Sequence, residues 1–500
     1  MKKDYNLLKI QKIDKNRLTF NATSYIINLK VNKSGVNYMF IGREKELADL
    51  NYLYEQNSFQ MFILYGRRRV GKTTLLGEFC KGKDTIFFAA EQDSDKGNLD
   101  KFSSLIFAHY NETILSPFSD WENAITFIAE KQREKRLILV FDEFPYLAKN
   151  NKKIFSVLQH LIDHKLQKGK LFIILCGSYM SFMEKEVLGE KSPIFGRRTA
   201  QLKLKPFPYY VAAEFVADCS AETKCEYYGA VGGTAQYLGR LKPSISFEKN
   251  ICNLFLKPTG YLYEEPRLLL RQEIQEPAIY NTIIEAIACG ASKSNEIATK
   301  TGEEQAKCLK YIQTLCELGL VYKETPFGEK ESSRKTIYGI SDFMFRFWYK
   351  YVFNNRSLLE TGGGQIVYEK KIKPDYNHYM GLVFERICKE FLEKKNIGGE
   401  LPILFSSIGR WWGTDSVQKQ EVEIDIIARD DKKYLIGECK WQNEKMDIGV
   451  LERLKEKANI FNNKREETWY TLFSKSGFTK SLLETSENDR HILLFDLKNM

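Results

Sequence analysis

Residues 60–74, QMFILYGRRRVGKTT, constrain this chain more than any other stretch. An apolar run of strand length breaks at Gly66, four residues lead to a second glycine, and a helix-compatible segment follows. Glycines at these two places let successive backbone N–H groups point at phosphate oxygens, and the helix adds its positive N-terminus. The stretch therefore predicts a phosphate-binding loop. We expect its nucleotide contacts to come from Gly66, Gly71, Lys72, Thr73 and Thr74, with the Thr73 hydroxyl also binding Mg²⁺.

Three consecutive arginines, Arg67, Arg68 and Arg69, occupy the loop between the two glycines. A guanidinium can pair with a phosphate or with a carboxylate of a neighbouring domain. The sequence pattern leaves both alternatives open.

Length and composition limit what this loop can belong to. The chain has 500 residues, which exceeds what one hydrophobic core serves and suggests about three domains. No apolar run approaches the roughly 18–20 residues that span a bilayer, so we expect no membrane partner. The ten cysteines form no CxxC pair and several lie in apolar patterns, which favours reduced thiols and a cytoplasmic location.

The net charge of +10 is concentrated at the start of the chain. Residues 1–38 hold eight lysines and arginines against two aspartates. We expect a poorly ordered basic extension there, with a phosphate-binding arm as the alternative. Met39 directly precedes the first organised motif, so a second translation start at this residue stays open.

A second buried run, residues 137–141, ends in Asp142 and Glu143. Strand and helix patterns alternate on both sides of it, which predicts an α/β fold with a mostly parallel sheet. Acids at the carboxyl end of such a strand lie where ligands bind. We expect Asp142 to hold Mg²⁺ and Glu143 to orient or deprotonate the attacking water, although an acid pair after a strand is also a common helix cap.

The segment Phe40-Ile41-Gly42-Arg43-Glu44, together with the loop and the acid pair, resembles the AAA+-like STAND class of P-loop ATPases. The likeness is greatest to an archaeal and bacterial group with a C-terminal nuclease-like domain. The resemblance implies ATP as the ligand, a Walker B role for Asp142 and Glu143, and an adenine-side role for Gly42, Arg43 and Glu44.

The same resemblance suggests further residues around the phosphates. Ser178 follows the buried run 171–175 and would contact the γ-phosphate or the attacking water, or instead cap the next helix. Arg197 and Arg198 are candidates for an arginine finger, acting in cis or from a neighbouring subunit of a homo-oligomer, or are plain surface charges. Gly233 belongs to a glycine turn of the lid, in which Ala235 replaces the proline usual in relatives.

Residues 275–355 read as three short helices followed by a strand pair, the order of a winged helix. Its third helix mixes acidic and basic residues, which weakens a reading as a DNA-binding helix. We favour a structural coupler that reports the nucleotide state, as in STAND relatives.

A second group of chemically capable residues lies beyond the glycine run 362–364. Glu438 and Lys440 alternate on one strand and therefore share a face, Asp425 lies on a neighbouring strand, and Glu385 lies on a helix upstream. Hard carboxylate ligands from Asp425, Glu438 and Glu385 suit Mg²⁺, and a lysine beside them can activate water. This arrangement resembles the PD-(D/E)xK nuclease-like fold.

The sequence therefore predicts an ATP- and Mg²⁺-dependent switch that gates a nuclease-like domain acting on DNA. The alternative is a regulatory or scaffold protein whose nuclease-like fold binds nucleic acid or protein without cleavage. The expected domains are a basic extension, a P-loop ATPase core, a helical lid, a winged helix and a restriction-endonuclease-like domain, at residues 1–38, 39–205, 206–274, 275–355 and 356–500.

Overall fold

A computed structural model describes residues 29–32, 35–38, 40–113, 116–132, 135–274, 276–431, 433–461 and 467–500. The chain divides into a first unit, Met1–Met39, and a second unit, Phe40–Met500. In the first unit, β1 (Leu29–Asn32) pairs with β2 (Gly35–Tyr38) in antiparallel register. The rest of the expected basic extension, and Met39, lie outside the described residues.

Five parallel strands form the first sheet of the second unit, in the order β4-β5-β6-β3-β7. The carboxyl ends of β3, β5 and β6 meet at one edge because the strands run in the same direction. Ligands of open α/β sheets bind at this edge. The strands are β3 (Gln60–Tyr65), β4 (Thr85–Ala89), β5 (Leu137–Asp142), β6 (Leu171–Gly177) and β7 (Ala200–Lys203).

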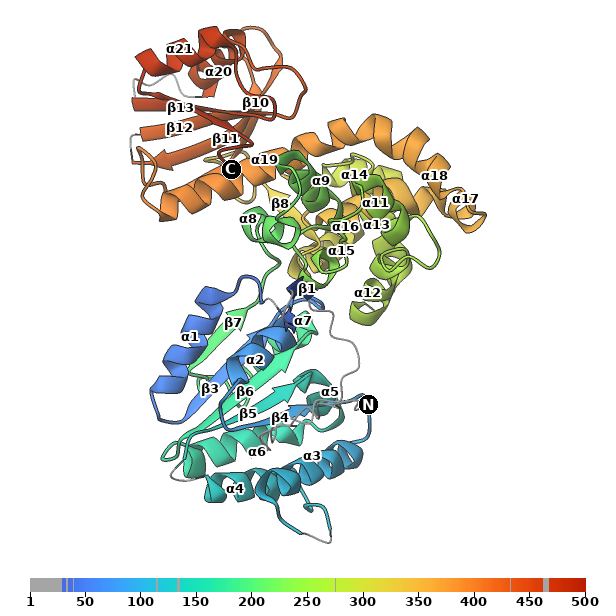
Figure 1. The fold of residues 1–500 in the computed structure, drawn as a ribbon, viewed down its shortest axis with the longest axis vertical. Coiled ribbons are helices and arrows are strands. Elements are labelled where there is room, and N and C mark those ends of the chain that lie inside the picture. Colours follow the sequence, from blue (N-terminus) through green and yellow to red (C-terminus); the bar gives the residue numbers. More distant parts are fainter. Residues whose placement is uncertain are drawn as a thin grey trace, which may run out of the picture. The chain divides into compact units, whose positions relative to one another are not determined.

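Helices cover both faces of this sheet, which explains why its central strands β3, β5 and β6 are buried along their whole length. Side chains alternate along β3, so Met61 and Ile63 join one hydrophobic cluster while Phe62 and Leu64 join another. Figure 1 shows the two layers, with α1 (Glu44–Glu55) and α2 (Lys72–Cys80) on one face. The other face carries α3 (Asp95–Tyr110), α4 (Trp121–Lys131) and α6 (Lys153–Leu161). The predicted α/β fold with a parallel sheet is therefore confirmed.

The next part of the chain is helical. Its first helices are α8 (Tyr209–Ala212), α9 (Ala221–Val231), α10 (Ala235–Leu238), α11 (Phe247–Phe255) and α12 (Glu265–Glu273). Three helices and an antiparallel hairpin follow, in the order that the sequence predicts; the winged-helix identity of this segment stays a prediction. They are α13 (Pro277–Ala288), α14 (Ser294–Thr301), α15 (Gln305–Glu317), β8 (Val321–Glu324) and β9 (Ile337–Ile340).

A long helix, α19 (Lys373–Ile397), connects this helical part to the C-terminal sheet. It follows the short helices α16 (Phe343–Phe347), α17 (Arg356–Glu360) and α18 (Gly364–Val367). Its Tyr379 hydroxyl donates to the carbonyl oxygen of Gly229 in α9 at 2.8 Å. A Cβ atom on Gly229 would lie 2.7 Å from Met380 Sδ, so this glycine permits the close approach of the two helices.

The second five-stranded sheet is mixed, in the order β10-β11-β12-β13-β14. The first three strands are antiparallel and the last three parallel: β10 (Ser407–Thr414), β11 (Glu421–Asp430), β12 (Lys433–Lys440), β13 (Glu467–Ser474) and β14 (Ile492–Asp496). One face packs on α19, and the other is covered by α20 (Ile448–Phe461) and α21 (Lys480–Asn488) (Figure 1).

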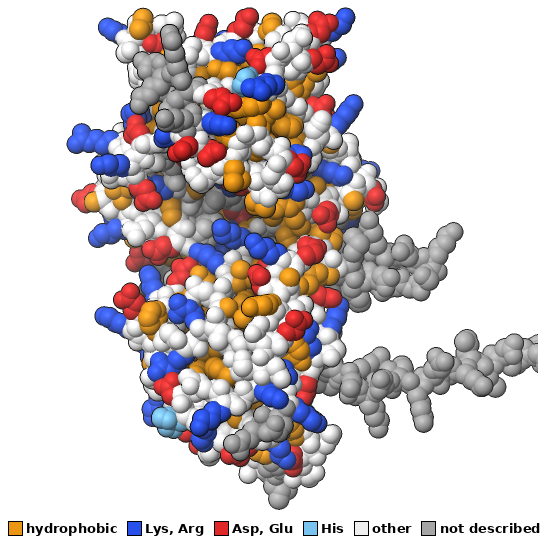
Figure 2. Space-filling view, turned by 90° about the vertical axis from the view of Figure 1, so that its left-hand side faces the viewer, with side chains coloured by type: hydrophobic (Ala, Val, Ile, Leu, Met, Phe, Trp, Pro, Cys, Tyr) orange, Lys and Arg blue, Asp and Glu red, His pale blue; other side chains and the backbone are white. Residues whose placement is uncertain are grey.

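Two surface properties bear on partners. Within the described ranges, every helix is too short or too polar to cross a membrane. On the face in Figure 2, acidic and basic side chains are interspersed, so the described residues of that face do not present a single basic stripe to a nucleic acid.

The aromatic core beneath β4 and β5 gives a stability test. Phe102 is fully buried, and its ring centroid lies 5.1 Å from Phe88, 5.2 Å from Trp121 and 5.4 Å from Phe141. We expect Phe102→Ala to lower the free energy of unfolding of this region by about 3–5 kcal/mol. Hydrogen exchange of the β4 and β5 amides measures the change. Leu309→Ala, at an exposed position of α15, is the control, and equal exchange in both variants would contradict the expectation.

Candidate functional site

The phosphate-binding loop leaves β3 and enters α2 through two glycines that a larger residue could not replace. Gly71 has a φ of 99° and is the N-cap of α2. A Cβ atom on Gly66 would lie 2.4 Å from the Leu204 carbonyl oxygen. The loop therefore has the strand, turn and helix context that its sequence pattern requires.

Two side chains of the loop converge on the end of β5. Lys72 is 6% exposed, and its Nζ donates to the carbonyl oxygens of Gly66 at 2.9 Å and Arg67 at 3.0 Å. The Thr73 hydroxyl donates to Asp142 Oδ2 at 2.8 Å. Burial raises the pKa of Asp142 above its usual range. Hard oxygen atoms of Thr73 and Asp142 thus lie together, which is a donor set that fits Mg²⁺. Thr74 is half-buried one position further along α2.

Glu143 and Ser178 lie next to this pair and bind each other. The Ser178 hydroxyl donates to Glu143 Oε1 at 2.8 Å and Oε2 at 2.7 Å, so Ser178 is a partner of the acid rather than the cap of the following helix. Glu143 itself is the N-cap of α5 (Phe144–Asn150), with a φ of 51° that few non-glycine residues adopt. Such strained positions cluster at functional sites.

The segment before β3 supports the loop through one buried arginine. Arg43 Nη2 donates to the carbonyl oxygens of Lys205 at 2.7 Å and Val70 at 3.2 Å, and its guanidinium stacks on Phe207. Gly42 has a φ of 68°, and a Cβ atom there would lie 2.7 Å from Val211 Cγ1. Glu44 is exposed at the start of α1. Arg43 therefore connects the phosphate-binding loop to the segment that leads into the lid.

The glycine turn of the lid touches the loop directly. The Gln236 amide donates to the Arg69 carbonyl oxygen at 3.3 Å, and a Cβ atom on Gly71 would lie 3.6 Å from the Ala235 side chain. Gly233 has no room for a side chain, because a Cβ atom there would lie 1.8 Å from the Phe207 carbonyl oxygen. The turn contacts the loop even though alanine replaces the expected proline.

Arg197 and Arg198, the two candidates for an arginine finger, have partners outside the phosphate-binding loop. Arg197 makes two hydrogen bonds with Asp163, at 2.8 and 2.7 Å, on the protein surface. The guanidinium of Arg198 lies over the ring of Phe195, 5.3 Å from its centroid. Their structural contacts match the surface-charge alternative that the sequence left open.

In the C-terminal sheet, Asp425, Glu438 and Lys440 lie on adjacent strands as their alternation predicts. Asp425 Oδ2 accepts from the Cys439 amide at 2.8 Å, and Lys440 Nζ donates to Glu438 Oε1 at 2.6 Å. A second lysine that sequence reasoning missed, Lys457 of α20, donates to Glu438 Oε2 at 2.9 Å. The sequence signal that could have identified Lys457 is its position on the inner side of an amphipathic helix.

Glu385 faces the same region from α19 but has a different partner. Arg410 of β10 lies 3.5 Å from Glu385 and also pairs with Glu423 and with Glu324 of β8. Burial, opposed by Arg410, raises the pKa of Glu385 to about 8. Burial and then the nearby Glu438 raise the pKa of Asp425 to about 6. The described residues contain no cluster of three or more His, Cys, Asp or Glu arranged to hold a metal ion.

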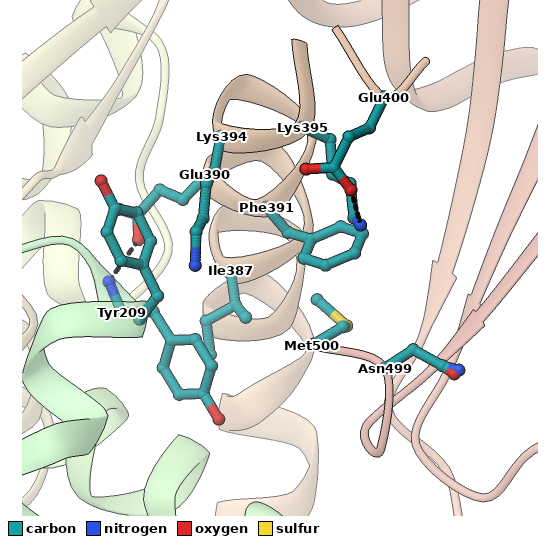
Figure 3. A pocket seen from close by; sticks show the side chains of 10 residues that line it. Tyr209, Ile387, Glu390, Phe391, Lys394, Lys395, Glu400, Asn499 and Met500 are labelled. Carbon is teal, nitrogen blue, oxygen red and sulfur yellow. Dashed lines mark hydrogen bonds and ion pairs between the residues drawn. The ribbon is translucent and has the colours of Figure 1, made fainter. Parts of the chain in front are cut away.

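A small cavity of about 160 Å³ lies between α8 and α19 (Figure 3). Glu390 of α19 accepts there from the Tyr209 amide at 2.7 Å and from the Tyr228 hydroxyl at 3.0 Å. Lys395 pairs with Glu400, and the last residue, Met500, closes one side. The candidate residues named above do not line it, so this cavity reflects a helix joint rather than the predicted site.

Two parts of the chain match known protein families. Residues 40–241 match a family described as an ATPase domain predominantly from Archaea. Residues 348–457 match a family described as archaeal and bacterial proteins of unknown function. Within residues 40–241 lie the phosphate-binding loop, Asp142, Glu143, Ser178 and the glycine turn, so the chain contains an archaeal-type ATPase domain.

Among solved structures, the Walker-type ATPase PABY2304 of Pyrococcus abyssi is similar, with 19% identity and a TM-score of 0.48, over 62% of this chain and 96% of that chain. The ORC2 protein of Aeropyrum pernix shares 15% identity with a TM-score of 0.40, over 64% of this chain and 95% of its own.

Two curated proteins of Methanocaldococcus jannaschii are similar in sequence. The uncharacterized ATP-binding protein MJ0423 is 47% identical over 45 residues, which are 9% of this chain and 76% of that protein. The uncharacterized protein MJECL04 is 33% identical over 463 residues, which are 92% of this chain and 100% of that protein. The chain therefore belongs to the same family as MJECL04, with an archaeal-type ATPase domain in its first half.

Proposed function

We propose that this protein is an ATP-hydrolysing switch whose nucleotide state gates a C-terminal, Mg²⁺-dependent nuclease-like domain acting on DNA. The observation that carries the ATP-binding part is the convergence of Lys72, Thr73 and Asp142 at the carboxyl edge of the parallel sheet, with Thr73 Oγ1 and Asp142 Oδ2 2.8 Å apart. The similar protein MJ0423 is described as ATP-binding, which supports the same ligand.

Each residue of the ATPase site has a chemical role in this proposal. Thr73 and Asp142 would hold Mg²⁺, which supplies charge neutralisation at the β and γ phosphates. Lys72 would exchange its two carbonyl acceptors for phosphate oxygens. Glu143 would orient the attacking water and accept its proton, and Ser178 would hold the Glu143 carboxylate in place.

Contacts on both sides of the helical part support coupling between the two domains. At the ATPase end, the Gln236 amide binds the Arg69 carbonyl oxygen. At the other end, the amide of Phe327, in the hairpin loop between β8 and β9, donates to the Arg410 carbonyl oxygen at 2.8 Å. Glu324 of β8 also lies 3.8 Å from the Arg410 guanidinium. A displacement of the hairpin would therefore alter the partners of Arg410, one of which is Glu385.

The C-terminal residues suit phosphodiester chemistry. Glu438 is buried and Asp425 is half-buried on the adjacent strand, close enough for Glu438 to raise the pKa of Asp425. Two carboxylates are enough to hold Mg²⁺ when water and a substrate phosphate complete its coordination. Lys440, with a half-exposed side chain, would position the water that attacks phosphorus.

One observation favours the alternative function. Lysines and an arginine already pair with the candidate acids: Lys440 and Lys457 with Glu438, and Arg410 with Glu385. A domain in which protein cations neutralise the acids could bind nucleic acid or a protein partner without cleavage. The protein would then be an ATP-dependent regulatory or scaffold protein.

The first test separates nucleotide binding from turnover. Lys72→Ala should weaken ATP binding about 10- to 100-fold, because it removes a charge-assisted contact to phosphate. Glu143→Gln should retain binding and lower kcat by about 10²–10⁴, because it removes the general base. Fluorescent-nucleotide titration and phosphate release measure the two effects. Lys81→Ala, an exposed position at the end of α2, is the control. Unchanged turnover in Glu143→Gln would reject the assigned role.

A second test concerns the partner of Glu143. Ser178→Ala removes the hydroxyl that donates to both carboxylate oxygens, so Glu143 loses its orientation. We expect kcat to fall about tenfold while the Kd for ATP stays the same. Steady-state kinetics and nucleotide titration separate these quantities. A change in Kd with kcat intact would instead assign Ser178 to nucleotide binding.

The third test distinguishes cleavage from binding without cleavage. Purified protein is incubated with supercoiled, linear and single-stranded DNA in the presence of Mg²⁺, with and without ATP. We expect cleavage that is lost in Asp425→Ala and Lys440→Ala and retained in Lys433→Ala, an exposed position at the far end of β12. DNA binding without cleavage by the wild-type protein would support the alternative.

A further inference from the structure

Arg68, in the middle of the phosphate-binding loop, lies near Glu143 and α5. Its Nη2 donates to the Tyr146 hydroxyl at 2.8 Å, and Tyr146 lies in α5, three residues after Glu143. Burial opposes the charge of Arg68, whereas Tyr146 and the Glu143 carboxylate favour it, and its pKa is raised above the usual value. The guanidinium therefore lies on the side of the loop where the γ-phosphate and the attacking water would be.

The hydrogen-bonding capacity of Arg68 is only partly used. A guanidinium has five N–H donors. Within the described residues, the buried Nε of Arg68 has no hydrogen-bond partner, and the nearest carboxylate, Glu273 Oε1 of α12, is 3.8 Å away. The Oε2 atom of Glu273 is also buried without a hydrogen bond. Donors in this state are available to an anion that enters the loop.

The two flanking arginines of the loop are engaged in tight pairs. Arg67 Nη1 lies 2.7 Å from Asp342 Oδ2, and Asp342 is the N-cap of α16. Arg69 Nη1 lies 2.7 Å from Glu265 Oε2, a carboxylate that is 1% exposed and also accepts from the Tyr237 hydroxyl at 2.7 Å. Arg67 and Arg69 therefore anchor the loop to the helical part, whereas Arg68 has no comparable partner among the described residues.

We propose that Arg68 is the arginine that stabilises the transferring phosphoryl group, supplied in cis by the loop itself, and that Tyr146 is its positioning residue. The inference rests on the proposed ATP hydrolysis at this site. It replaces Arg197 and Arg198, whose contacts are with Asp163 and Phe195, in the finger role.

The chemistry of this role is electrostatic. Negative charge on the γ-phosphoryl oxygens is redistributed as the bond to the β-phosphate oxygen breaks and water attacks in line. A preorganised guanidinium donates hydrogen bonds to those oxygens without forming or breaking a covalent bond of its own. Because Glu273 comes from α12, a shift of the helical part would change the carboxylate that competes with the phosphate for Arg68.

The test compares Arg68→Ala with Arg197→Ala in the full chain. Arg68→Ala should lower kcat about 10²–10³-fold while the Kd for ATP changes by less than about threefold. Added guanidinium chloride at low concentration should restore part of the lost kcat, which a purely structural defect would not allow. Arg197→Ala should stay within about twofold of wild type, since its surface ion pair contributes little.

Tyr146→Phe provides a second measurement that does not remove the charge. It should lower kcat several-fold with KM unchanged, because the guanidinium loses the one short side-chain hydrogen bond that it makes with the described residues. If wild type hydrolyses ATP and Arg68→Ala turns over equally fast, the proposal for Arg68 fails while the ATPase function stands. If wild type binds ATP without hydrolysing it, the proposed ATP hydrolysis is rejected, and the role of Arg68 in that hydrolysis is rejected with it.

Discussion

Lys72 is a buried cation at the centre of the ATPase domain, and much of the surrounding structure accommodates it. A buried ammonium must be hydrogen-bonded, and here the loop carbonyl oxygens of Gly66 and Arg67 accept its hydrogen bonds. Those carbonyls can turn inward only because Gly66 and Gly71 allow the loop to bend so closely. Asp142 lies at the end of β5, two strands from β3 in the sheet, and its Oδ2 accepts from the Thr73 hydroxyl beside Lys72. The loop, the sheet order and the acid at the end of β5 are therefore parts of one electrostatic arrangement.

The sequence predicted the parallel sheet and the order of its strands along the chain well, because a strand buried on both faces leaves an unbroken apolar run. It also predicted which strand ends carry polar residues. It did not predict side-chain direction. Ser178 and Arg197 each had two readings, and only three-dimensional placement brings Ser178 to Glu143 and Arg197 to Asp163. The strand pattern predicts which strand ends share an edge of the sheet, but it does not say which individual side chains pair there.

The three arginines of the loop illustrate the same limit. The sequence left two partners open for all three, a phosphate or a neighbouring domain, and the three side chains point in different directions from the tight turn. Arg67 meets Asp342, which is 275 residues away in the chain, and Arg69 meets Glu265. Likewise, Lys457 approaches Glu438 from a helix that follows the strand pair, and the spacing rules for strands did not include it. Arg410 precedes two tryptophans in the sequence, and only the fold brings its three acidic partners, Glu324, Glu385 and Glu423, to it.

Helix α19 carries two half-buried carboxylates that face different parts of the molecule. Glu390 accepts hydrogen bonds from Tyr209 and Tyr228 of the helical part, whereas Glu385 faces Arg410 of the C-terminal sheet. Five residues separate them, a rise of about 7.5 Å along one continuous helix. Because an α-helix is stiff along its axis, a displacement of one of these carboxylates along the helix also displaces the other. Any insertion or deletion of a single residue between positions 385 and 390 would rotate one carboxylate about 100° away from its partners, which makes the length of this segment as constrained as its composition.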